Sequence, residues 1–157
     1  MRARFSDDPG ELRRALQAAG LRVTQPRIAV LTSLARRSHA SAEDVCETVR
    51  TALPRTSLQA VYNVLGDLTA AGLLRRLEPA GSRALYERRV GDNHHHLVCR
   101  TCGTIRDIDC TIGISPCLAP ESTHGFSIDE AEVTFWGLCP SCTRRDAHET
   151  TPTTGGE

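Results

Sequence analysis

Two Cys-x-x-Cys pairs, Cys99 with Cys102 and Cys139 with Cys142, limit what this 157-residue chain can fold into. Two such pairs supply the four thiolates of a closed tetrahedral zinc site. They lie further apart than the pairs of a zinc ribbon, so a shared Zn(II) ion would tie distant segments of one domain together and stabilise the fold directly. The alternative is redox cycling of the dithiol "CPSC", but no βαβ pattern surrounds it.

Cysteine usage and hydropathy indicate a soluble, cytoplasmic protein. No apolar run approaches the roughly 18 residues of a membrane span, and "MRARFSDDPGELRR" lacks the apolar segment of a signal peptide. Seven cysteines do not form a closed set of disulfides. Cys46, Cys110 and Cys117 lie outside the two pairs and are interpreted as small buried hydrophobes, with accessory thiol sensing as the alternative.

Charge divides the chain into two halves. Residues 1–90 hold 15 arginines against 9 acidic residues, whereas residues 91–157 hold 4 arginines against 10 acidic residues. Every one of the 19 basic residues is arginine, whose guanidinium group suits phosphate oxygens and base edges. A genome rich in arginine codons accounts for the missing lysine equally well, but it does not explain why the positive charge is concentrated in the first half of the chain.

The basic half has helical periodicity in four short segments. They are "PGELRRALQAAG", which ends at Gly20, "TQPRIAVLTSLARR" with Thr24 as N-cap, "SAEDVCETVRTAL" starting at Ser41, and "TSLQAVYNVLGDLTAAG" capped by Thr56 or Ser57. After Gly72, "LLRRLEP" and "RALYERR" flank the turn "AGS" and predict a two-stranded hairpin.

Helices followed by a β-hairpin predict a winged helix-turn-helix domain, in which the helix Ser57–Ala71 enters the major groove of duplex DNA. The predicted DNA-contacting residues lie on this helix, just before the second helix and in its first turn: Arg22, Arg27, Ser57, Gln59, Tyr62 and Asn63. Gln59, Tyr62 and Asn63 project opposite the apolar face of their helix. A plain helical domain with a solvated polar face is the alternative.

The stretch "HHHLVCRTCGTIRDID" predicts a second metal site beside the first cysteine pair. If "HHHLV" is a strand, His94 and His96 share one face and His95 takes the other. Pairing Cys99 with Thr104 across a turn places Asp107 opposite His96. This nitrogen and oxygen donor set suits Fe, Mn, Ni or exchangeable Zn rather than a closed thiolate site. A solvated polar strand is the alternative.

Six motifs together resemble the ferric uptake regulator family of metal-dependent bacterial repressors over about residues 10–143. They are "GLRVTQPR", "HASAEDV", "LQAVYNVL", "GSRALYE", "HHHLVCRTCG" and "CPSC". The resemblance implies an α/β (α+β) homodimer with a winged-helix DNA-binding domain over residues 1–89 and a zinc-containing dimerisation domain over residues 90–143. The polar residues 144–157 are expected to form a disordered tail.

The resemblance also implies a regulatory site for Fe(II) or Mn(II), with the ligands His39, Glu87, His94, His96 and Asp107. It agrees with the strand argument for His94, His96 and Asp107, and it alone supplies His39 and Glu87. An ion bound by all five would fix the angle between the two domains and favour the arrangement that binds a double-stranded DNA operator.

Details within the motifs relate the chain to two branches of that family. Asp107 is typical of the peroxide-sensing branch, whereas Glu87 is typical of the iron-uptake branch. "VGDNHHHLVCR" and "GFSIDEAEVTFWG" most resemble actinobacterial regulators of catalase-peroxidase, in which Fe(II) and peroxide oxidise a ligand imidazole, here His39 or His94. An iron-uptake or zinc regulator is the alternative. Many members have an arginine where this chain has Asn63, so the operator sequence does not carry over.

Other classes fit the sequence less well. The deaminase signature H-x-E with P-C-x-x-C is absent and no nucleophile stands beside a base, so we expect no enzyme. A metal-storage module would not need the arginine-rich helix. The segment "TIGISPCLAPESTHG" has turn-like composition and is expected to be short or irregular, with no assignable third metal site.

Overall fold

The structure is a computed structural model of the chain that describes residues 8–79, 81–91, 94–109, 120–128, 131 and 133–149. It contains two compact units, residues 1–91 and residues 92–157, called here the N-terminal and C-terminal units. No helix in the described residues is long and apolar enough to cross a membrane.

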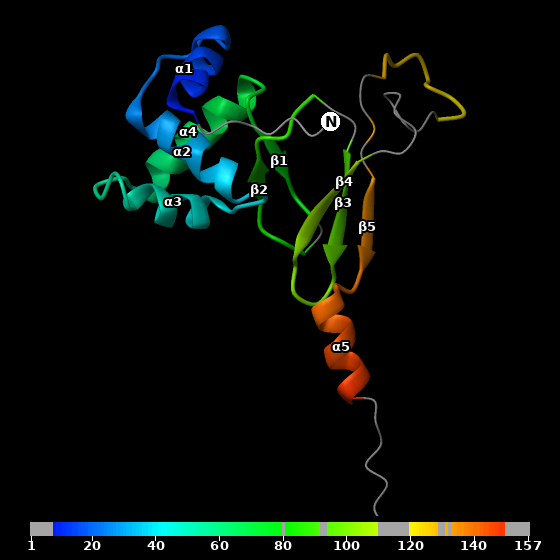
Figure 1. Cartoon of the computed structure of the whole chain (residues 1–157). Helices are drawn as coiled ribbons and strands as arrows, with labels where there is room; N and C mark the ends of the chain where they lie inside the picture. Colours follow the sequence, from blue (N-terminus) through cyan, green and yellow to red (C-terminus); the bar gives the residue numbers. More distant parts are fainter. Residues whose placement is uncertain are drawn as a thin grey trace, which may run out of the picture. The chain divides into compact units, whose positions relative to one another are not determined.

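Four helices begin the N-terminal unit: α1 (Pro9–Ala18), α2 (Gln25–Arg36), α3 (Ala42–Arg50) and α4 (Leu58–Ala70) (Figure 1). Each follows a side chain that accepts a hydrogen bond from a free N–H of the first turn, as an N-cap does; these caps are Asp8, Thr24, Ser41 and Ser57. Ser41 and Asp44 form a reciprocal capping box on α3. The predicted helices and the predicted caps Thr24, Ser41 and Ser57 are therefore confirmed, and Asp8 is a further cap that was not predicted.

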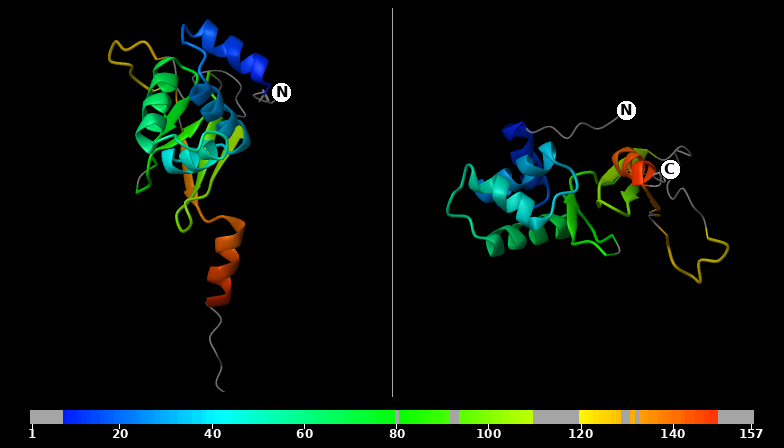
Figure 2. Two further views of the ribbon diagram at one scale, coloured as in Figure 1. Left: turned by 90° about the vertical axis from the view of Figure 1, so that its left-hand side faces the viewer. Right: turned by 90° about the horizontal axis from the view of Figure 1, so that it is seen from below.

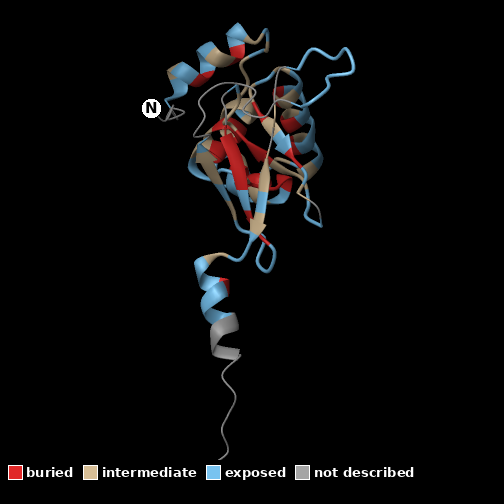
Figure 3. Ribbon diagram, turned by 90° about the vertical axis from the view of Figure 1, so that its right-hand side faces the viewer, coloured by how far each residue is buried: buried red, intermediate tan, exposed pale blue. Residues whose placement is uncertain are grey.

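The inner faces of these helices form one apolar core. Leu16, Val30, Val45, Leu65 and Leu68 are all fully buried in it. Figure 2 shows the helices packed around one another from two further directions, and Figure 3 shows that exposed residues occupy their outer faces. The spacing of the buried residues on α4 fixes the rotation of this helix, so its polar face is directed to solvent.

A short hairpin completes the N-terminal unit. Its strands β1 (Arg75–Leu77) and β2 (Leu85–Glu87) pair antiparallel, with Arg75 opposite Glu87. An isolated bridge between Ala40 and Tyr86 joins β2 to the segment between α2 and α3. The backbone N–H groups of both residues donate to the partner's carbonyl, at 3.2 and 2.9 Å. The bridge therefore fixes His39, which precedes Ala40, against the end of β2.

The described residues of the C-terminal unit form a three-stranded sheet and one helix. The strands β3 (His94–Cys99), β4 (Ile105–Asp109) and β5 (Thr134–Gly137) have the order β4-β3-β5, and α5 (Pro140–Glu149) follows β5. β4 pairs antiparallel with β3 and β5 pairs parallel with it. The register places Asp107 opposite His96, which confirms the pairing predicted from the sequence.

The structure corrects one boundary. Residues 144–149 continue the helix α5, so the prediction of a disordered tail is wrong for these residues. Residues 150–157 of that tail lie outside the described residues, as do Cys110, Cys117 and most of "TIGISPCLAPESTHG".

We expect the core of α4, and not its polar face, to determine stability. Leu65→Ala should lower the free energy of unfolding by about 2–5 kcal/mol, because it leaves a cavity at a fully buried position. Gln59→Ala, on the exposed face of the same helix, should change it by less than about 0.5 kcal/mol. Urea denaturation followed by circular dichroism measures both, and similar losses in the two variants would contradict the assigned rotation of α4.

Candidate functional site

The two cysteine pairs meet at one end of the C-terminal sheet. β3 ends at Cys99, and a turn with Gly103 in the left-handed region (φ 70°) brings Cys102 back beside it. The N–H of Cys99 donates to the Thr104 carbonyl at 2.9 Å, which closes this turn. β5 runs parallel to β3 and places Gly137 next to Cys99, so the chain delivers Cys139 to the same place.

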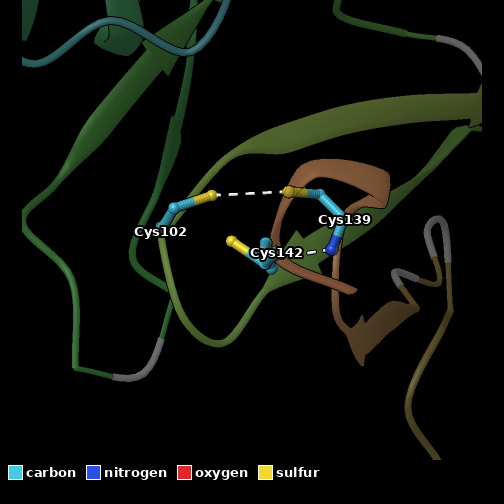
Figure 4. Close-up of side chains that lie close together, drawn as sticks. Cys102, Cys139 and Cys142 are labelled. Atoms are coloured by element: carbon cyan, nitrogen blue, oxygen red, sulfur yellow. Dashed lines mark hydrogen bonds between the residues drawn. The ribbon is translucent and has the colours of Figure 1, made fainter. Parts of the chain in front are cut away.

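The four sulfurs have the spacing of a tetrahedral metal site. All four lie within 4.8 Å of one another, and the sulfurs of Cys102 and Cys139 are 3.7 Å apart (Figure 4). A tetrahedron with metal–sulfur bonds of about 2.3 Å has edges of about 3.8 Å. A disulfide would require about 2.05 Å, and each of these four cysteines is a free thiol. The donor set therefore fits Zn(II).

Hydrogen-bond donors surround these sulfurs. The N–H of Cys139 donates to the sulfur of Cys99 at 3.3 Å, and the hydroxyl of Thr104 lies 3.1 Å from the sulfur of Cys102. The guanidinium group of Arg145 donates to the sulfur of Cys142 at 2.9 Å.

The pKa values of the thiols reflect these surroundings. Backbone N–H groups of Cys102 and Cys139 lower the pKa of Cys99 to about 6. The Thr104 hydroxyl lowers the pKa of Cys102. At Cys142 the Arg145 hydrogen bond lowers the pKa, but burial and the neighbouring sulfurs outweigh it and raise the pKa to about 11. Metal binding at neutral pH must therefore displace a proton from Cys142.

A histidine and a carboxylate meet in the N-terminal unit. The Nε2 of His39 lies 2.8 Å from Oε2 of Glu87, and the side chains of both are buried. His39 adopts the left-handed backbone conformation (φ 57°), which is uncommon for a residue with a side chain. The bridge between Ala40 and Tyr86 holds the two residues in adjacent positions. Such retained strain is a frequent property of functional sites.

A second group of histidine and carboxylate donors lies in the C-terminal unit. Nε2 of His96 lies 3.7 Å from Oδ1 of Asp107 on the neighbouring strand. The rings of His94 and His96 lie 4.9 Å apart between their centroids, on the same face of β3. His95 points to the other face, where its ring contacts Phe135 with 6.4 Å between centroids. The sorting of the three histidines by strand face is therefore confirmed.

The outward face of α4 carries the predicted DNA-contacting side chains. Gln59, Tyr62 and Asn63 are exposed, and the amide of Gln59 donates to Oδ1 of Asn63 at 2.9 Å. The hydroxyl of Tyr62 donates to Glu43 on α3 at 3.0 Å. Ser57 caps the helix by accepting from the N–H of Ala60 at 3.1 Å.

The two predicted arginines differ in their surroundings. Arg22 is exposed, as a contact with a DNA phosphate requires. The guanidinium of Arg27 donates to the Arg22 carbonyl at 2.8 Å and to Asp67 on α4 at 2.6 Å. Arg27 therefore connects α2 with α4.

Known regulators of one family resemble this chain in sequence. A sequence model described as the ferric uptake regulator family matches residues 18–136. The transcriptional regulator FurA of Mycobacterium tuberculosis is 55% identical over 137 residues, which cover 87% of this chain and 93% of FurA. The chain belongs to the ferric uptake regulator family. It is accordingly a metal-responsive transcriptional regulator and not an enzyme.

Solved structures of the family share its architecture. The Vibrio cholerae ferric uptake regulator, described as showing a rearrangement of its DNA-binding domains, matches with a TM-score of 0.64 and 25% identity, covering 81% of this chain and 98% of that one. The Pseudomonas aeruginosa regulator with manganese matches with a TM-score of 0.62 and 28% identity, covering 82% and 98%. The predicted α+β class with a winged helix is therefore confirmed.

Three side chains around these groups were not expected from the sequence. They are Thr104 and Arg145 beside the cysteine sulfurs and Glu43 beside Tyr62. Two of them have a signal in the sequence. Thr104 is the residue paired with Cys99 in the predicted register, and Arg145 lies three residues after Cys142, on the same face of a helix. Glu43 has no such local signal, because its contact joins two helices.

We expect loss of any one sulfur to release the metal from this family member. Replacing Cys99, Cys102, Cys139 or Cys142 with Ser should lower the zinc content below one ion per chain and lower the melting temperature, because three thiolates tether the segments loosely. Inductively coupled plasma emission spectrometry measures the zinc content, and differential scanning calorimetry measures the melting temperature. Cys46→Ala is the matched control, since Cys46 is buried among the helices and should keep the zinc content unchanged. Wild-type protein stripped of metal with unchanged melting would contradict the assignment.

Proposed function

We propose that this protein is a cytoplasmic, metal-dependent repressor that binds a double-stranded DNA operator as a homodimer. Peroxide releases it from DNA by oxidising an Fe(II) site, and oxidative-stress genes such as that of catalase-peroxidase are then expressed. The observation that carries the proposal is the separation of two donor chemistries. One site is built from four thiolates, and the other donors are imidazoles paired with carboxylates.

The thiolate group is the structural site in this proposal. Cys99, Cys102, Cys139 and Cys142 hold Zn(II), which has no redox chemistry and accepts a closed tetrahedron of thiolates. The sulfur spacing supports this assignment, since the contact of 3.7 Å matches the edge of such a tetrahedron. Such a site gives stability without an open position for a reactant.

The imidazole and carboxylate groups are the regulatory site in this proposal. Its ligands are His39, Glu87, His94, His96 and Asp107. Nitrogen and oxygen donors suit Fe(II) and Mn(II), which exchange more readily than thiolate-bound zinc. Two histidine–carboxylate pairs, His39 with Glu87 and His96 with Asp107, already lie close within their own units. The Pseudomonas relative, whose structure is described with manganese, supports this choice of ions.

An ion held by ligands from both units would change the equilibrium between their arrangements. It favours one arrangement only by the difference in its affinity for the two. The favoured arrangement presents two α4 helices to two half-sites of an operator, as a two-fold dimer requires. Loss of a ligand removes the affinity difference, and repression ends.

Peroxide provides the means of losing a ligand. Fe(II) held by these residues would supply the redox chemistry that places one oxygen atom of peroxide on the imidazole of His39 or His94, while the other oxygen atom leaves as water. Mn(II) does not reduce peroxide in this way, so the Mn(II) protein remains on DNA. Asp107 would hold the ion through a shorter side chain than Glu, and in this proposal its length tunes the reaction of the ion with peroxide.

The dimer is supported by an exposed apolar surface on the C-terminal unit. Leu97 on β3 and Phe135 on β5 are neighbours in register and are 44% and 47% exposed, and Leu138 is 45% exposed. Adjacent exposed apolar side chains on a sheet typically mark a protein interface. A second copy of the chain is the partner that a two-fold operator requires.

The DNA-contacting face generates one prediction. Tyr62→Ala or Gln59→Ala should weaken operator binding by about 1–3 kcal/mol if each contacts a base, with little change on random DNA. Fluorescence anisotropy at several salt concentrations measures both affinities. Gln17→Ala, an exposed glutamine on α1, is the control and should leave both unchanged. Equal losses on operator and random DNA would identify Tyr62 and Gln59 as contacts to the backbone.

The switch generates another prediction. His96→Ala should abolish metal activation, whereas Asp107→Glu should keep metal-dependent DNA binding and blunt its release by peroxide. Mass spectrometry of the Fe(II) protein after peroxide should show one added oxygen on the peptide with His39 or the peptide with His94.

Two results would overturn this mechanism. Oxygen found only on cysteines would favour a thiol switch at Cys46, Cys110 or Cys117. Equal release of the Mn(II) and Fe(II) proteins by peroxide would also contradict it. Metal-dependent binding that peroxide does not affect would instead support an iron-uptake or zinc regulator of the same family.

A further inference from the structure

Two side chains next to the cysteine sulfurs have no part in the function proposed above. Arg145 on α5 donates from Nη2 to the sulfur of Cys142 at 2.9 Å. The hydroxyl of Thr104 lies 3.1 Å from the sulfur of Cys102. A thiolate has no proton to donate, so the Thr104 hydroxyl is the donor once Cys102 binds a metal.

The charge of the site gives these donors a role. Zn(II) with four thiolates carries two net negative charges, and the excess electron density lies on the sulfurs. A hydrogen bond to an ionised acceptor is about twice as strong as one between neutral groups, and the guanidinium of Arg145 adds its positive charge. Cys142 also lies in the first turn of α5, where free N–H groups favour negative charge.

The two sulfurs concerned differ in accessibility. Cys102 lies on the exposed turn after β3, whereas Cys142 is 1% exposed. Thr104 therefore acts on a sulfur that reagents reach directly. Arg145 acts on a sulfur that the folded chain shields from solvent.

We propose that Arg145 and Thr104 are positioning residues that protect the zinc-bound thiolates of Cys142 and Cys102 from electrophiles. This proposal rests on the structural zinc site proposed above. Each hydrogen bond withdraws electron density from the sulfur lone pair that would attack an electrophile, and so slows the loss of the ligand and of the ion. A peroxide sensor needs such protection, because its structural site must outlast the oxidation of its regulatory site.

Alkylation by iodoacetamide tests this protection without the regulatory metal. The sulfur lone pair forms a bond to carbon, the carbon–iodine bond breaks, and iodide leaves. The resulting thioether is neutral and binds Zn(II) weakly, so the ion dissociates. A chromophoric chelator in the solution reports the rate of this release.

The experiment uses the full-length zinc-loaded protein and three variants. Arg145→Met keeps the length and cover of the side chain but has no donor, and Thr104→Val keeps the shape of threonine without its hydroxyl. Arg144→Met changes the adjacent exposed arginine of α5 and is the matched control. Zinc content is measured first in each protein.

We expect Arg145→Met and Thr104→Val to release zinc faster than wild type, on the order of tenfold. Peptide mapping at early times should show a larger share of the alkylation on Cys142 in Arg145→Met than in wild type, and a larger share on Cys102 in Thr104→Val than in wild type. The Arg144→Met protein should match wild type. A variant that lacks zinc before any reagent is added, while Arg144→Met retains it, also supports the role of the donor.

Other results would overturn the proposal. Wild-type release rates in both Arg145→Met and Thr104→Val would exclude a protective hydrogen bond. Equal acceleration in Arg144→Met would show a general effect on α5. Wild-type protein that contains no zinc would overturn the structural site itself, and this proposal with it, which distinguishes the two failures.

Discussion

The convergence of four cysteine sulfurs is the constraint on which the C-terminal unit depends. In the part of the chain that the structure describes, the buried apolar side chains of this unit are Val98, Cys99 and Cys142, whereas the N-terminal unit has a core of helices and hairpin. A unit this small cannot bury enough apolar surface to offset the entropy of ordering its chain. A Zn(II) ion bound by Cys99, Cys102, Cys139 and Cys142, as proposed above, would supply the missing stabilisation.

β3 connects this constraint to regulation. The strand begins with the histidine donors His94 and His96 and ends at Cys99, a ligand of the thiolate group. The neighbouring strands add a donor group to each end of β3. β4 brings Asp107 beside His96, and β5 brings the second cysteine pair toward Cys99. In the proposed function, the closed site would therefore fix the strand on which the exchangeable site is built. A redox-inert ion at one end would keep the geometry while the donors at the other end react.

The sequence predicted what depends on local periodicity. Helix caps, the hairpin and the pairing of His96 with Asp107 all follow from spacing within one segment or across one turn. The contact of Tyr62 with Glu43 did not follow, because it depends on how α3 packs on α4. Polar composition predicted disorder after residue 143, but the backbone continues as α5. A metal bound by Cys139 and Cys142 would fix the first turn of α5 and so favour the helix, which hydropathy does not detect.

The side chains of α4 that are proposed to contact DNA already make hydrogen bonds within the protein. The Gln59 amide is bonded to Asn63 and the Tyr62 hydroxyl to Glu43, so contact with a base exchanges a hydrogen bond for another. Glu43 also lies 3.5 Å from Arg83, which is in the turn of the hairpin, so this contact holds an exposed positive charge near the partner of Tyr62. Exposed pairs of this kind contribute little to stability, so they are exchanged at small cost. In the proposed function, specificity would depend on whether a base edge satisfies these groups better than their partners in the protein do, and phosphate contacts would provide the affinity common to all sequences.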